Sequence, residues 1–261
     1  MKGSQYLIIF FLGILILGSC ANNEQWNHIH TVKVSAEVKT DKHKKAYENG
    51  DTIETPPYDI TVDMEFMDTT EVENADACKR INAQLIERFL DIKNSCDCEE
   101  AVNQFIDRLQ REYEQEEMAP EIYDHFTGKA EYGKEGVINY TLVEDYYGGG
   151  AHPSIVTSIL RFDANTGERI DLYGFFVDTC TNSLCDKLTT RLMEKVGAPT
   201  LDSLHALGYL EMENMFVSEN FLLKKDSVSF FYNQYDIAPY AMGCTTLSFG
   251  YDELKDWIRK K

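Results

Sequence analysis

Apolar and polar side chains alternate in two runs near the start of the chain, and each run predicts a half-buried β-strand. Residues 31–39 place valines and one alanine at every second position, and residues 58–68 repeat the pattern with larger apolar side chains. Successive side chains of a strand point to opposite faces, so each run buries one face and leaves the other to solvent. The charged stretch between them, residues 40–55, predicts a solvated excursion.

The spacing of apolar residues then changes to three and four positions, which is typical of an amphipathic helix. One such stripe lies in residues 75–92 and a second in residues 102–113, and Pro120 predicts the end of the second helix. The remaining expected elements are a β-hairpin at 122–132 and 137–147, a strand at 154–162, a tight turn at 163–167, helices at 181–196 and 201–207, a hairpin at 220–223 and 228–232, a strand at 245–249 and a closing helix at 251–258.

This order of elements predicts an α+β fold, mainly antiparallel in its sheet, with helices packed on it. We expect two intimately associated subdomains, residues 31–136 and residues 137–261. Apolar residues make up 43% of the chain and aromatic residues 12%, which is enough to build a core and excludes a disordered protein.

The N-terminus predicts export and a lipid anchor. Lys2 supplies a positive charge, and the apolar run at residues 7–17 is shorter than the roughly 20 residues that a spanning helix needs. The run ends in Leu17-Gly18-Ser19-Cys20, which resembles the bacterial lipobox, where the cysteine is acylated. We expect a lipoprotein signal peptide at residues 1–19, lipid attachment at Cys20 and a tether at residues 20–30; an ordinary secretory signal is the alternative. The expected location is the cell envelope, anchored by lipid to a membrane, with the outer membrane favoured and its periplasmic or external face left open.

The chain is strongly acidic, with a formal net charge of −19. This charge excludes non-specific binding of nucleic acid, which depends on basic side chains that neutralise phosphates. Two interpretations stay open: the charge steers a cationic partner toward the protein, or it keeps an exported protein soluble.

Six further cysteines follow Cys20, and an even number in an exported chain permits three disulfides among 15 connectivities. They are Cys78, Cys96, Cys98, Cys180, Cys185 and Cys244. Free buried thiols and a zinc site are the alternatives. We expect no metal and no cofactor.

Two segments concentrate glycine, proline and aromatic residues, a composition typical of shaped surface loops. They are residues 146–153, YYGGGAHP, and residues 231–243, FYNQYDIAPYAMG. The candidate ligand-binding residues are Tyr146, Tyr147, Gly149, His152, Tyr232, Asn233, Tyr235 and Tyr240. The alternative is structural: the first segment is a wide bulge between strands, and the rings of the second seal the end of a sheet.

Together these segments resemble the lysozyme-binding extracellular domain of RsiV-type anti-sigma factors. The turn at 163–167 and residues 220–243 carry that likeness, and residues 31–117 resemble, more loosely, the N-terminal module of a PdaC-type peptidoglycan deacetylase. The resemblance implies a non-catalytic extracytoplasmic binding module whose partner is a cationic protein such as lysozyme, which it senses or neutralises. Binding of peptidoglycan or another glycan is the alternative.

Catalytic motifs are missing from the sequence. It contains no Gly-x-Ser-x-Gly, His-Glu-x-x-His or Ser-x-x-Lys pattern and no phosphate loop. Glu144 and Asp145 could form a carboxylate pair for glycosidic chemistry, but neighbouring residues of a strand point to opposite faces. We therefore expect no catalytic residues, and a cell-wall hydrolase is the third and weakest hypothesis.

Overall fold

The computed structural model describes residues 29–259 apart from 47–49, 51, 71, 96, 116–120, 178, 180 and 212–213. The expected signal peptide, Cys20, Cys96 and Cys180 lie outside the described residues. The described chain is α+β with a mainly antiparallel sheet, which confirms the predicted fold class. None of its helices is long and apolar enough to cross a membrane.

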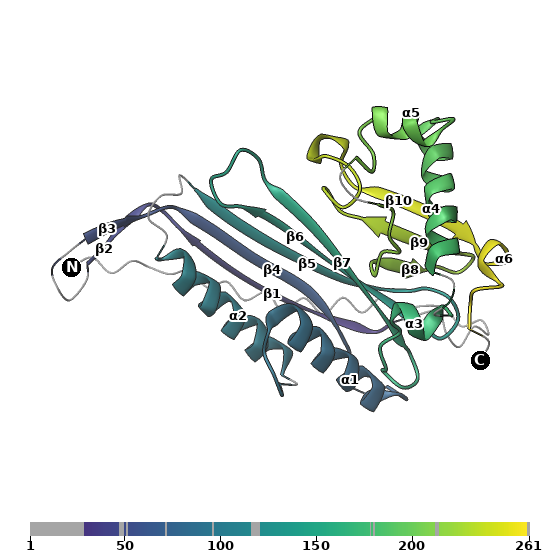
Figure 1. The fold of residues 1–261 in the computed structure, drawn as a ribbon. Helices are drawn as coiled ribbons and strands as arrows, with labels where there is room; N and C mark the ends of the chain where they lie inside the picture. The colour runs from purple at the N-terminus through teal and green to yellow at the C-terminus, as the bar shows by residue number, and fades with distance from the viewer. Residues whose placement is uncertain are drawn as a thin grey trace, which may run out of the picture. The chain divides into compact units, whose positions relative to one another are not determined.

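Figure 1 shows the strands and helices along the chain. The strands are β1 (Thr31–Thr40), β2 (His43–Ala46), β3 (Thr52–Thr55), β4 (Tyr58–Met67), β5 (Ile122–Tyr132), β6 (Val137–Tyr147), β7 (Ser154–Asp163), β8 (Phe221–Leu223), β9 (Ser227–Tyr232) and β10 (Thr245–Gly250). The helices are α1 (Ala75–Leu85), α2 (Cys98–Tyr113), α3 (Leu172–Phe175), α4 (Thr181–Val196), α5 (Leu201–Ala206) and α6 (Tyr251–Leu254), with a π-helical turn at Ile86–Leu90 and a 3-10 turn at Tyr240–Met242.

The strands form sheets in the orders β1-β4-β5-β6-β7, β10-β9-β8 and β2-β3. β4 and β5 are parallel neighbours, while the β1–β4, β2–β3, β8–β9 and β9–β10 pairs are antiparallel. A parallel pair needs a long crossover, and the chain between β4 and β5 supplies one that contains α1 and α2. The charged stretch at residues 40–55, which the sequence predicted to extend into solvent, contains the β2–β3 hairpin.

By its internal contacts the chain divides into two compact units. The first unit holds the described residues up to Ala130, with Leu142–Ile155 and Asn165–Gly167. The second unit holds Glu131–Thr141, Val156–Ala164 and the chain from Glu168 onward. The division is not a single cut, because β5, β6 and β7 each contribute residues to both units.

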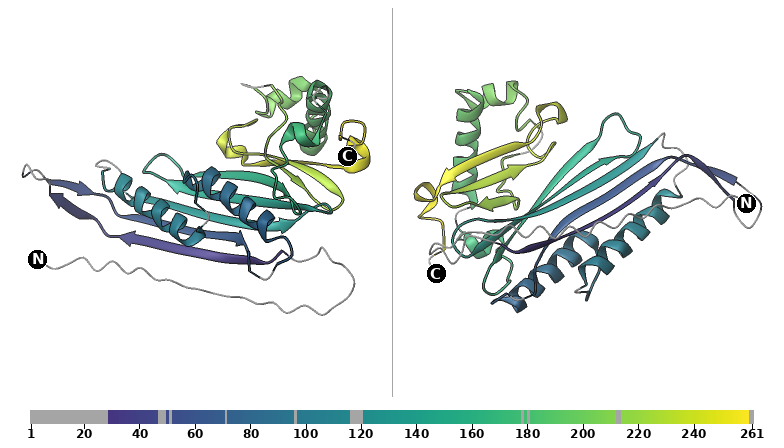
Figure 2. Two further views of the ribbon diagram at one scale, coloured as in Figure 1. Left: turned by 90° about the horizontal axis from the view of Figure 1, so that it is seen from below. Right: turned by 180° about the vertical axis from the view of Figure 1, so that it is seen from behind.

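In the first unit, α1 and α2 cover one face of the sheet. Both helices contact β4, and α2 also contacts β1; Figures 1 and 2 show the two helices along the same face. The buried side chains of β4 are Tyr58, Ile60, Val62, Met64 and Phe66, together with Met67 at its end. The opposite face is polar: Asp59 accepts from Lys39 at 2.6 Å and Asp63 accepts from Ser35 at 2.5 Å. One buried and one solvated face explain the alternation that the sequence shows.

Helix boundaries in the first unit follow from local chemistry. α2 begins at Cys98 because the carboxylate of Asp97 accepts a hydrogen bond from the backbone nitrogen of Glu100, at 3.0 Å. The π-helical turn after α1 ends at Asp91, which has φ +54° in the left-handed region. The predicted stripe at 75–92 is therefore one helical segment whose last turn widens.

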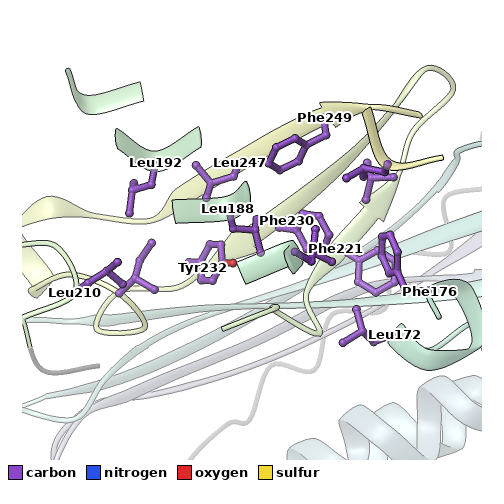
Figure 3. Close-up of a cluster of buried hydrophobic side chains, with 14 of the residues drawn as sticks. Leu172, Phe176, Leu188, Leu192, Leu210, Phe221, Phe230, Tyr232, Leu247 and Phe249 are labelled. Carbon is purple, nitrogen blue, oxygen red and sulfur yellow. The ribbon is translucent and has the colours of Figure 1, made fainter. Parts of the chain in front are cut away.

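The core of the second unit forms where α4 packs on the three-stranded sheet. Figure 3 shows Leu188 and Leu192 of α4 beside Phe230 of β9 and Leu247 and Phe249 of β10. These side chains are at most 1% exposed, and burying each one stabilises the fold by roughly 1.5–3 kcal/mol.

Arg161 on β7 is a fully buried cation in this second unit. Its guanidinium donates to the carbonyl oxygens of Ile159, Glu219, Phe221 and Ile170 at 2.7–3.1 Å. The guanidinium carbon lies 3.7 Å from the centroid of the Phe221 ring, a cation–π contact. Burial lowers the pKa of Arg161 to about 9.

Three of the six cysteines that permit disulfides are free thiols in the structure. Cys78, Cys185 and Cys244 form no disulfide. Cys78 and Cys185 are half-buried on helices, and burial raises the pKa of both thiols, which favours the protonated form. At these two positions the alternative interpretation, partly buried free thiols, describes the structure.

Candidate functional site

The second predicted loop is a closed and well-supported turn after β9, which we call the Tyr235 loop (residues 233–240). Its first residue, Asn233, accepts from the backbone nitrogen of Thr157 at 2.7 Å and donates to the carbonyl oxygen of Thr157 at 3.0 Å. The carboxylate of Asp236 accepts from the backbone nitrogen of Asn233 at 2.7 Å, and Tyr235 donates its backbone N–H to Ala238 at 3.1 Å. The loop therefore has a fixed shape before any ligand arrives.

Tyr235 is an exposed aromatic residue of this loop. Its side chain is 62% exposed, and its backbone has φ +70°, in the left-handed region. That conformation costs a non-glycine residue roughly 1–2 kcal/mol. The ring of Tyr240 lies 6.0 Å away, centroid to centroid, at an interplanar angle of 38°. Strain of this kind persists where the surroundings enforce it, and it is concentrated at functional sites.

Beside Tyr235 lies a pocket of about 260 Å³. Its lining residues are Gly208, Leu210, Glu211, Tyr235, Asp236, Ile237, Ala238 and Pro239. The backbone nitrogen of Leu210 donates to the carbonyl oxygen of Ile237 at 2.9 Å, which joins the two segments that form the walls. Two carboxylates, Glu211 and Asp236, stand in this mostly apolar lining, so the pocket carries negative charge.

Tyr232 was predicted to contact a ligand, and the structure contradicts that role. It is fully buried, its hydroxyl donates to the carbonyl oxygen of Phe216 at 2.7 Å, and burial raises its pKa. Tyr232 thus supports the loop from beneath. The side-chain amide of Asn233 bonds to the backbone of Thr157. Tyr235 and Tyr240 are then the predicted residues of this loop that a ligand can reach.

The first predicted loop joins β6 to β7 in the first unit. Gly149 has φ +82°, which favours glycine, and a Cβ atom on Gly148 would come within 2.1 Å of the Tyr146 hydroxyl oxygen. Tyr147 donates its hydroxyl to the carbonyl oxygen of Gly150 at 3.1 Å, and the exposed His152 hydrogen-bonds its Nδ1 to the carbonyl oxygen of Pro153 at 2.9 Å. These contacts fix the shape of the loop, and that shape accounts for the glycines in its sequence. The two predicted loops belong to different units.

Sequence reasoning missed the wall of the pocket formed by residues 208–211. The signal was present: Leu207-Gly208-Tyr209-Leu210 places apolar residues around a glycine directly after a short helix. Leu207 is 47% exposed, and Leu210 has a left-handed φ of +56°. The link to Ile237 joins residues far apart in the sequence, so local patterns could not reveal it.

The pocket and the Tyr235 loop lie in a segment with known relatives. Residues 175–252 match the family model described as Protein of unknown function (DUF3298). The match includes α4, α5, β8, β9, β10 and every residue that lines the pocket. No curated protein matches the chain.

Solved structures of DUF3298 proteins share the fold over most of the chain. A member from Bacteroides fragilis NCTC 9343 has a TM-score of 0.74 at 21% identity, and the match covers 90% of this chain and 96% of that one. A DUF3298 protein from Pseudomonas aeruginosa PAO1 has a TM-score of 0.58 at 14% identity, covering 89% and 95%. At these identities the likeness shows the fold.

Proposed function

We propose that this protein is a lipid-anchored binding protein of the cell envelope, and that its second unit binds a partner through Tyr235, Tyr240 and the neighbouring pocket. The observation that carries the proposal is the exposed, left-handed Tyr235 on a turn fixed by hydrogen bonds. A rigid aromatic side chain gives large contact area at low entropic cost, as in antibody paratopes. The pocket beside it can receive a partner's side chain.

A cationic protein such as lysozyme fits this surface best. The whole chain carries a formal charge of −19, and Glu211 and Asp236 line the pocket. Opposite charge on the partner would speed association, and burial of Tyr235 would slow dissociation. The likeness to the RsiV-type domain supports the same partner class.

Binding of a glycan such as peptidoglycan is the second candidate. The specific observation in its favour is the Tyr235–Tyr240 pair, two rings 6.0 Å apart on one turn with acidic hydrogen-bond acceptors next to them. Sugars stack on such rings through their apolar faces and bond to neighbouring polar groups. Charge contributes little to that mode.

The test compares Tyr235→Ala with a matched control, Tyr173→Ala. Tyr173 is 53% exposed on α3 of the same unit and lies outside the pocket. With the full chain in mild detergent and hen-type lysozyme as the probe, Tyr235→Ala should weaken binding by about tenfold or more, and Tyr173→Ala by less than about twofold. Equal losses in the two variants would contradict the assignment of the site.

Salt separates the two partner classes. Binding steered by net charge should weaken clearly between about 0.02 and 0.15 M salt, whereas stacking on a neutral sugar should hardly change. If the chain sediments with insoluble peptidoglycan equally at both concentrations and does not bind lysozyme, the glycan is the ligand.

Anchoring at Cys20 is tested independently of binding. A Cys20→Ser variant should lose incorporation of labelled fatty acid and leave the membrane fraction, because acyl chains contribute about 0.8 kcal/mol per buried methylene. A variant that stays with the membrane and still takes up label would contradict the lipobox assignment.

A further inference from the structure

A second hollow lies entirely within the first unit, under the end of α2, and the function proposed above does not use it. It has a volume of about 350 Å³. Its apolar lining includes Phe89, Phe126 and Tyr146, and its polar lining consists of Tyr113, Asp124 and Glu144. Phe126 is fixed by an edge contact to Phe105 of α2, with centroids 5.0 Å apart. We call this hollow the Asp124 groove.

Asp124 occupies a position where β5 should carry an apolar side chain. It lies between Ile122 and Phe126 on the buried face of the strand and is only 3% exposed. Tyr113 donates its hydroxyl to Oδ2 of Asp124 at 2.6 Å. The other oxygen, Oδ1, is buried and has no hydrogen-bond partner among the described residues. Buried carboxylate oxygens without a partner are rare and call for an explanation.

The groove also lacks a counter-charge. Glu144 lines it together with Asp124, and none of the described side chains in the lining is basic. Burial, opposed by the Tyr113 hydrogen bond and reinforced by the charges of Glu144 and Asp145, raises the pKa of Asp124 to about 7. Burial also raises the pKa of Glu144. One buried and one half-buried carboxyl group, with no basic side chain in the described lining, form a site that a positive charge would stabilise.

We propose that the Asp124 groove binds a small organic cation: a primary ammonium group carried on an apolar body. The ammonium would donate hydrogen bonds to Oδ1 of Asp124 and to the carboxylate of Glu144. The apolar body would lie against Phe89, Phe126 and Tyr146, whose electron-rich faces also attract a cation. A metal ion fits less well, because Ca²⁺ or Mg²⁺ takes about six oxygen ligands and this lining is largely aromatic.

The test uses 2-phenylethylamine and its neutral analogue 2-phenylethanol as calorimetric probes of the full chain in non-ionic detergent, with detergent alone as a blank. The amine should bind saturably and at least about tenfold more tightly than the alcohol. Asp124→Asn should weaken the amine by about tenfold or more while keeping an oxygen for the Tyr113 hydroxyl. Glu37→Gln, which removes an exposed charge from β1 in the same unit, should leave binding within about twofold.

A second variant guards against a folding defect in Asp124→Asn. Glu144 is half-buried, so Glu144→Gln should fold normally and weaken the amine by about three- to tenfold. Tyr235→Ala should leave amine binding unchanged, which separates this site from the function proposed for the second unit. The proposal is overturned if the alcohol binds as tightly as the amine, if Glu37→Gln weakens binding as much as Asp124→Asn, or if the amine shows no saturation below about 10 mM.

Discussion

Arg161 in the second unit and Asp124 in the first unit are both buried ionisable side chains, yet their surroundings differ. The Arg161 guanidinium donates to four backbone carbonyl oxygens and lies over the Phe221 ring. Asp124 accepts one described hydrogen bond, from Tyr113, and holds a second oxygen with none. One guanidinium nitrogen of Arg161, Nη2, is also buried without a hydrogen-bond partner among the described residues, but Nε and Nη1 have acceptors that suit the charge. The neighbours of Asp124, in contrast, include further carboxyl groups.

The difference distinguishes a buried charge that stabilises the fold from a buried charge that is available to bind a ligand. Four backbone carbonyl oxygens compensate Nε and Nη1 of Arg161 inside the fold, and these contacts hold β7 to residues 219–221. Asp124 is compensated only in part, and this partly compensated carboxyl group lines a groove. Burial and one polar atom without a partner are common to both residues, and the number and charge of their neighbours distinguish them.

Replacing Arg161 should give the largest effect on stability. Arg161→Met keeps most of the volume but leaves the carbonyl oxygens of Ile159, Glu219, Phe221 and Ile170 without this donor. Because each buried unsatisfied group costs about 1–3 kcal/mol, we expect a loss of roughly 3–5 kcal/mol in urea unfolding. Arg169→Met, an exposed arginine in the same unit, should change stability by less than about 0.5 kcal/mol. A loss below about 1 kcal/mol in Arg161→Met would show that these contacts are incidental.

Whereas Arg161 should stabilise the fold, the ionised form of Asp124 should destabilise it, so the effect of Asp124 on stability should depend on pH. Its pKa is about 7 in the folded protein against a reference of 3.8, so between these values the folded state keeps a proton that the unfolded chain has lost. Stability from this residue is therefore present at low pH and is lost as pH rises from about 4 to about 7, by up to about 4 kcal/mol.

The matching measurement is urea unfolding of wild type and Asp124→Asn at pH 5 and pH 8. The asparagine variant cannot ionise, so its stability should fall less with pH, and it should exceed wild type at pH 8 by roughly 2–4 kcal/mol. Parallel curves for the two proteins would mean that Asp124 already has its compensation inside the fold, as Arg161 does.

The sequence predicted the elements with strong local periodicity. The hairpin at 122–132 and 137–147 and the helix at 181–196 coincide with β5, β6 and α4. Each has a single apolar stripe or face bounded by turn residues, so local rules suffice. α3 was missed because it is only four residues long; its one sign was Asp171, whose carboxylate accepts from the backbone nitrogen of Gly174 at 2.5 Å.

The site residues were harder to predict because they depend on contacts between distant segments. Glu144 and Asp145 were set aside as neighbours that cannot converge; the carboxyl that shares the groove with Glu144 is Asp124, from the adjoining strand. The sign in the sequence was that Asp124 and Glu144 each occupy an alternating position of their strand that otherwise carries apolar side chains. Tyr232 was misassigned since aromatic composition alone does not tell a buried ring from an exposed one.

Both units also share a device, a buried asparagine that pairs with the backbone of one distant residue. In the first unit Asn82 accepts from and donates to Met67 at 2.8 and 2.9 Å, and in the second Asn139 does the same with Leu223 at 3.0 and 3.1 Å. Asn82→Ala and Asn139→Ala should each cost about 2–3 kcal/mol in urea unfolding, because two backbone groups lose partners. Asn182→Ala, exposed on α4, is the control and should cost less than about 0.5 kcal/mol. Unequal losses would show that one unit depends more on its asparagine than the other.

The second unit also contains an unfavourable backbone conformation, at the exposed residue Tyr235. Its φ of +70° costs a side chain about 1–2 kcal/mol but costs glycine almost nothing. The free energy of unfolding of Tyr235→Gly should therefore exceed that of Tyr235→Ala by about 0.5–1 kcal/mol. This figure already subtracts the cost of glycine's greater freedom in the unfolded chain. Both variants should lose partner binding equally, since the ring is gone in each. If alanine proves the more stable of the two, the backbone at residue 235 relaxes readily, and the loop does not hold Tyr235 in place ahead of binding.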